Sequence, residues 1–127
     1  MNPLLQIGAV ALGGACGASA RYLVGGWVAA RAGAGFPWGT LIINATGSFL
    51  LCFLATLAVE RYRIPPLWYL ALGAGFCGGY TTFSTFSYET LRLAAEGSWG
   101  RAAANVAASV AAGLLFGVLG ILAGRAV

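Results

Sequence analysis

The chain has 127 residues, of which 60% are hydrophobic and only 8% are charged. A soluble domain carries about 25% charged residues, so this composition excludes an ordinary soluble fold and indicates a membrane protein. The net charge of +4 comes from scattered arginines, a distribution that provides no basic patch for nucleic acid.

Four apolar stretches are long enough to cross a bilayer, for which about 20 residues suffice. They cover roughly residues 4–30, 38–59, 66–93 and 102–124, and short connections separate them. We expect an all-α membrane protein with a single transmembrane domain over residues 1–127. The first stretch is interpreted as a retained span and not as a signal peptide, because no basic residue precedes it.

The first span contains Arg21, the only arginine far from a predicted connection. A charge at the bilayer centre costs about 2.5–3.5 kcal/mol even on the lenient insertion scale. One interpretation is that the side chain reaches the lipid headgroups. The other is that it lies at a water-filled vestibule, where it attracts anions.

The second span carries Asn44 among apolar residues. An amide in hydrocarbon needs hydrogen-bond partners, so Asn44 is expected to face protein or water. It either contributes to a polar path through the membrane or only joins two helices by a hydrogen bond.

The third span contains the glycine pair Gly78-Gly79 in the middle of an uncharged run. Each glycine weakens a helix by roughly 1 kcal/mol, and this pair lies about 18 Å along the helix from Pro66. That position is near mid-membrane, where irregular backbone is tolerated only against protein or a water-filled cavity. We therefore predict that the third helix is broken at the glycine pair.

Hydroxyl residues and two phenylalanines follow the glycine pair. Phe83 and Phe86 are three residues apart and share a helix face, while the fourth span places Ser109 four residues after Asn105. Hydroxyl donors and the positive edges of phenyl rings suit a small anion, and carbonyls freed at a helix break suit a cation. The alternative is that each hydroxyl bonds back to its own helix and that the rings face lipid.

The arginines are shared equally between the two ends of the predicted bundle. One end has Arg61, Arg63 and Arg125, and the other has Arg31, Arg92 and Arg101. The positive-inside rule then gives no preferred orientation. We expect the chain to insert both ways and to pair as an antiparallel, dual-topology homodimer, in the manner of the inverted repeats of transporters.

Catalysis is not expected. The chain has no histidine and its three cysteines are isolated in apolar runs. It therefore lacks a nucleophile–base pair, and the cysteines indicate neither a disulfide framework nor a metal site. The prediction is that the protein is not an enzyme.

Three motifs resemble those of the Fluc (CrcB) fluoride channels. Residues 78–87 (GGYTTFSTFS) resemble the third-helix signature of this family, which is highly specific. Residues 39–47 (GTLIINATG) resemble its second-helix motif, and residues 13–22 resemble its first-helix motif. The resemblance extends over the whole chain in length, span count and motif order.

The resemblance implies a fluoride-selective channel in the cell (inner) membrane that exports fluoride passively from the cytoplasm. It implies two pores in an antiparallel homodimer, with a structural Na⁺ at the dimer interface held by the carbonyls of Gly78 and Thr81 from both subunits. It places Arg21 at a vestibule. The residues that match or neighbour the family's pore are Phe83, Phe86, Asn44, Thr82, Ser84, Thr85 and Ser109.

The chain departs from the family pattern at three positions. Some members have Tyr where Asn105 stands and Ser where Gly113 stands, and Tyr80 replaces a more usual aliphatic residue. Two other functions remain open. A small multidrug-resistance-type antiporter would need a carboxylate in the first span, which this chain lacks, and a non-conducting accessory protein would need no polar path.

Overall fold

The computed structural model describes residues 1–127 and consists of helices without any strand. Three long helices are α1 (Pro3–Ala32), α2 (Trp38–Ala55) and α6 (Trp99–Ala126), and α2 continues into a π-helical turn, η1 (Thr56–Glu60). These three helices are long and apolar enough to cross a membrane. The expectation of an all-α fold is confirmed.

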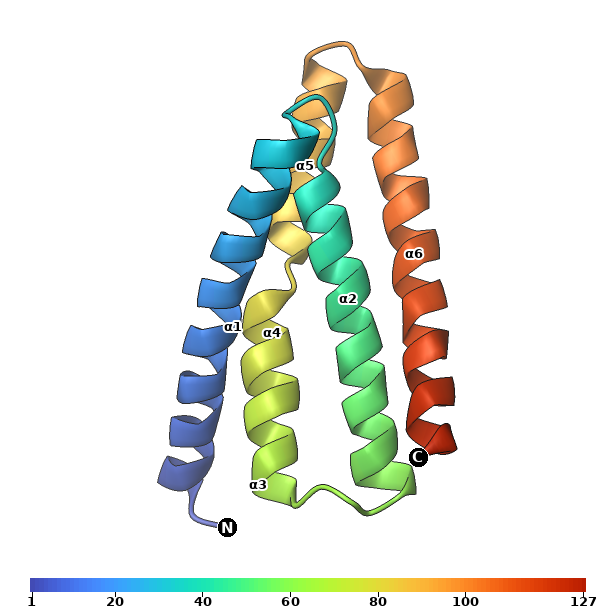
Figure 1. The fold of residues 1–127 in the computed structure, drawn as a ribbon. Helices are drawn as coiled ribbons and strands as arrows, with labels where there is room; N and C mark the ends of the chain where they lie inside the picture. The colour runs from blue at the N-terminus through green and yellow to red at the C-terminus, as the bar shows by residue number, and fades with distance from the viewer.

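The third crossing is made of shorter pieces. It runs through α3 (Pro66–Tyr69), the π-helical η2 (Leu70–Cys77) and α4 (Gly78–Tyr80), and then restarts as α5 (Phe83–Ala95). Figure 1 shows α4 and α5 separated by a short non-helical link near the middle of the molecule. The chain therefore has four crossings, of which the third is broken.

The position predicted for the break is wrong by a few residues. Gly78 and Gly79 are helical, and the extended residues are Thr81 (φ −81°, ψ 159°) and Thr82 (φ −153°, ψ 116°). Gly79 serves packing instead, because a Cβ there would lie 2.5 Å from the carbonyl oxygen of Gly14 on α1, whereas a Cβ on Gly78 would meet no atom within 4 Å. Small residues of this kind let two membrane helices approach closely.

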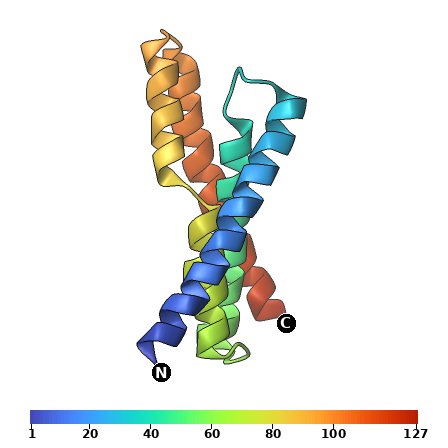
Figure 2. The same ribbon diagram turned by 90° about the vertical axis from the view of Figure 1, so that its left-hand side faces the viewer.

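Beyond the break the bundle divides into two arms. Figure 2 shows α5 and the adjoining half of α6 diverging from the end of α1 and the start of α2. The α5 helix packs chiefly on α6. Both chain termini lie at the opposite end of the molecule (Figure 1), as four crossings require.

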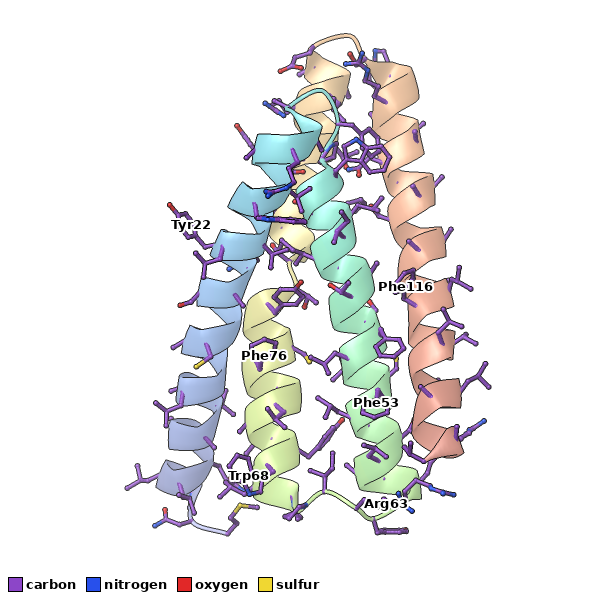
Figure 3. All side chains as sticks on the ribbon, viewed as in Figure 1. Tyr22, Phe53, Arg63, Trp68, Phe76 and Phe116 are labelled. Carbon is purple, nitrogen blue, oxygen red and sulfur yellow. The ribbon has the colours of Figure 1, made fainter.

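The surface of the single chain is mostly apolar. Only 17 of the 127 residues are buried, and large side chains such as Leu4 and Leu114 are exposed. Tyr22 points away from the bundle (Figure 3) and is 81% exposed. Such a surface belongs against lipid or another protein and not against water.

Candidate ion-binding site at the helix break

Asn44 on α2 bonds to the backbone on both sides of Thr82. Its Oδ1 accepts from the Thr82 N–H at 2.8 Å, and its Nδ2 donates to the Thr82 carbonyl at 3.0 Å. Thr82 is only 9% exposed, so water is largely excluded as a replacement. Asn44 therefore takes the place of the missing helical partners, and one hydrogen of its Nδ2 remains for another acceptor.

The break leaves backbone carbonyls without their helical partners, among them those of Gly78 and Thr81. In an unbroken helix the carbonyl of Gly78 would accept from the N–H of residue 82, and that of Thr81 from the N–H of residue 85. Here the Thr82 N–H donates to Asn44 Oδ1, and the Thr85 N–H donates to Thr82 Oγ1 at 3.2 Å. The carbonyls of Gly78 and Thr81 thus lack their helical partners.

Three hydroxyls cluster at the start of α5. Thr82 Oγ1 donates to Thr85 Oγ1 at 3.0 Å and lies 3.4 Å from Ser84 Oγ. Other hydroxyls bond back to their own helix: Thr81 donates to the Cys77 carbonyl and Ser87 to the Phe83 carbonyl. The cluster of three hydroxyls therefore lies at the first turn of α5, where unpaired N–H groups give the helix a positive end.

Phe83 and Phe86 form one aromatic pair on α5. Their ring centroids are 5.6 Å apart with the planes at 47°. Phe86 is half-buried, Ser84 is exposed, and Phe83 is 80% exposed. This face of α5 is consequently open in a single chain.

A cavity of about 970 Å³ lies between the two arms. Arg21 from α1 lines it together with Thr82 and Thr85 of α5. The other charged side chains in the cavity wall are Glu89 and Arg92, so two arginines face one carboxylate there. The lining is net positive and suits an anion.

Comparison with known proteins decides the class of this molecule. The model of the family described as CrcB-like protein, Camphor Resistance (CrcB), matches residues 8–121. The chain belongs to this family. The resemblance drawn from the three motifs is thereby confirmed.

Three relatives of this CrcB-like chain are each named Fluoride-specific ion channel FluC. That of Acidobacterium capsulatum is 49% identical over 116 residues, which cover 91% of the chain and 93% of the relative. That of Geobacter metallireducens is 48% identical over 122 residues, covering 96% and 98%, and that of Geobacter sulfurreducens is 47% identical over 117 residues, covering 92% and 94%.

These relatives are named as ion channels and not as enzymes, which agrees with the expectation that the CrcB-like chain is not catalytic. Four helical crossings and relatives of this kind make it a multi-pass membrane protein.

The structure brings some of the predicted site residues together and leaves others apart. Arg21, Thr82 and Thr85 share the cavity, whereas Asn44 is engaged with the backbone of the break. Ser109 lies on α6 and donates to Asn105 Oδ1 at 3.3 Å. Gly78 and Thr81 contribute carbonyls at the end of α4, outside the cavity wall.

Sequence reasoning missed the pair of Thr40 and Glu89. Thr40 Oγ1 donates to Glu89 Oε1 at 2.7 Å across 49 residues of sequence, and Glu89 Oε2 is buried without a partner. Glu89 is the only acidic residue within a predicted span, near the far end of residues 66–93, and this is the only sequence signal that points to it. No spacing in the sequence of the CrcB-like chain points to Thr40 as its partner.

Proposed function

We propose that the protein is a fluoride-selective channel that exports fluoride passively from the cytoplasm across the inner membrane. The observation that carries the proposal is the hydroxyl-bearing first turn of α5, which adjoins a net positive cavity at a helix break. The shared name of its relatives, Fluoride-specific ion channel FluC, supports the choice of ion.

The cavity supplies the entry step. An anion is attracted by Arg21 and by the positive end of α5, which adjoins the same space. Moving a bare anion into a low-dielectric interior costs tens of kcal/mol. Donors along the path offset this cost in small steps, as rapid conduction requires. They are the Thr85 hydroxyl, which accepts from Thr82 and keeps its own hydrogen, the free Nδ2 hydrogen of Asn44 and the ring edges of the phenylalanines.

An antiparallel homodimer completes the path. The face of α5 with Phe83, Phe86 and Ser84 is open in one chain, and an inverted second copy would cover it. Three arginines at each end give no orientation preference. Two equivalent paths, and hence two pores per dimer, follow from the two-fold symmetry.

The freed carbonyls fit a structural sodium ion. Hard cations prefer oxygen ligands, and the carbonyls of Gly78 and Thr81 have lost their helical partners. Two copies of the break would offer four such oxygens. When bound, Na⁺ would supply positive charge that neutralises these carbonyl dipoles and joins the two chains, while the hydroxyls and rings of α5 handle the anion.

Fluoride efflux from proteoliposomes tests the proposal, with chloride efflux as the comparison. We expect rapid fluoride efflux and little chloride efflux. Equal rates for the two ions would reject selectivity. Absence of efflux for both ions would favour the alternative that the protein is a non-conducting accessory protein.

Terminal reporter fusions test the antiparallel dimer. Both orientations are expected in the same membrane. A single fixed orientation would reject the dual topology while leaving the ion specificity to the efflux assay.

A further inference from the structure

Asn105 is a buried amide about two turns from the N-terminal end of the apolar helix α6. It is only 1% exposed, and with Cys77 it is one of the two largest side chains that are fully buried. A buried amide is costly unless its polar atoms are paired. One partner, Ser109, lies on the same helix α6, and the other, Thr90, lies on α5. The bond to Thr90 distinguishes Asn105 from the hydroxyls that bond only to their own helix.

The hydrogen bonds of Asn105 form a relay from α6 to the backbone of α5. Ser109 Oγ donates to Asn105 Oδ1 at 3.3 Å, and Asn105 Nδ2 donates to Thr90 Oγ1 at 2.9 Å. Thr90 Oγ1 then donates to the carbonyl of Phe86 at 2.8 Å. The relay ends on one of the two phenylalanines of the aromatic pair.

The direction of the relay is fixed by its last bond. A hydroxyl has one hydrogen, and that of Thr90 is committed to the Phe86 carbonyl, so Thr90 can only accept from Asn105. The amide must therefore point Nδ2 toward Thr90 and Oδ1 toward Ser109. The single hydrogen of Ser109 is in turn directed at Asn105, and Ser109 offers only lone pairs elsewhere.

We propose that Asn105 is a positioning residue for anion passage, an inference that rests on the proposed channel function. It ties the Phe86 turn of α5 to α6, and it holds the Ser109 hydrogen until an approaching anion draws it away. The Ser109–Asn105 bond is the longest of the relay and the easiest to exchange. While the Ser109 hydroxyl donates to the anion, Asn105 Oδ1 is left without a hydrogen-bond partner. This favours return of the Ser109 hydrogen to Asn105, so the anion is bound only weakly.

The variants separate this role from simple packing. Asn105→Leu removes the relay, and Asn105→Leu combined with Thr90→Val replaces both partners by apolar groups, which largely restores stability. Thr56→Val is the matched control, since Thr56 is 4% exposed but bonds only to the Cys52 carbonyl of its own helix. Thermal unfolding and fluoride efflux are measured for each variant and for the unmodified chain.

We expect fluoride efflux to fall about tenfold in N105L and in the double variant, the effect of roughly one lost hydrogen bond. The double variant should unfold near the temperature of the unmodified chain, and the control should conduct normally. A double variant that conducts like the unmodified chain would overturn the inference, and it also decides the matter where N105L alone fails to fold. Absence of fluoride efflux from the unmodified chain would instead reject the proposed function.

A second measurement addresses Ser109. Ser109→Ala is expected to raise the half-saturating fluoride concentration about threefold in the unmodified chain, and to change it little in the double variant, because contacting residues are coupled. Equal effects in both backgrounds would overturn the claim that Asn105 controls the Ser109 hydrogen, since a purely structural role predicts no coupling.

Discussion

Replacing Asn44 by leucine removes both side-chain bonds to Thr82 while keeping the approximate volume. A buried backbone group left unpaired costs about 1–3 kcal/mol, so the N–H and the carbonyl of Thr82 together set an expected loss of unfolding free energy of about 2–6 kcal/mol. Hydrogen bonds in membrane proteins average only about 0.6 kcal/mol, and the Thr82 N–H can return to the Gly78 carbonyl if the helix closes. We therefore expect N44L to lose about 2 kcal/mol of unfolding free energy, the low end of that range.

Denaturation in detergent measures this loss, and hydrogen exchange reports the Thr82 amide directly. Ser48→Ala is the control, because Ser48 Oγ bonds only to the Asn44 carbonyl one turn away on α2. The S48A variant should lose less than about 0.5 kcal/mol of unfolding free energy, as expected for hydroxyls that bond back to their own helix. Equal stability of N44L and S48A, with unchanged exchange at Thr82, would refute the assignment of Asn44 as the residue that holds the break.

Three further predictions concern the same region. Phe83→Ile or Phe86→Ile should reduce fluoride efflux by about tenfold, because loss of a ring edge raises the free-energy barrier to anion passage by about the energy of one aromatic contact. Phe116→Ile on α6 is the control. Tyr80→Phe should cost at most about 1 kcal/mol in unfolding free energy, since it removes only the 3.0 Å bond to Thr46. Exchanging Na⁺ for a large organic cation should dissociate the dimer on size-exclusion chromatography, and an unchanged dimer would contradict the sodium proposal.

The four crossings and their helical character were predictable because they depend on run length and hydropathy alone. Four apolar stretches suffice for four crossings whatever their neighbours are. The break was foreseen from Gly78 and Gly79, but its position was not. Whether a glycine weakens a helix or lets another backbone approach depends on a contact with α1, here Gly14, which no local pattern contains.

The candidate site was predictable in composition and not in connectivity. Helical spacing placed Phe83 and Phe86 on one face, and their rings are paired. It did not distinguish Thr82, whose hydroxyl joins a cluster, from Thr81, whose hydroxyl bonds back to its helix. The bond between Thr40 and Glu89 depends on how α2 and α5 pack, and the sequence separation of 49 residues hides it.

The proposed cation and anion sites have a common origin in two diverted N–H groups. The bond from Thr82 to Asn44 frees the Gly78 carbonyl, and the bond from Thr85 to Thr82 Oγ1 frees the Thr81 carbonyl. These same two bonds begin α5 and create its positive, hydroxyl-bearing end. A substitution that closes the break would therefore remove carbonyl ligands and anion donors together. For N44L, sodium dependence and fluoride efflux should be lost in parallel, whereas loss of one alone would show that the two sites are built independently.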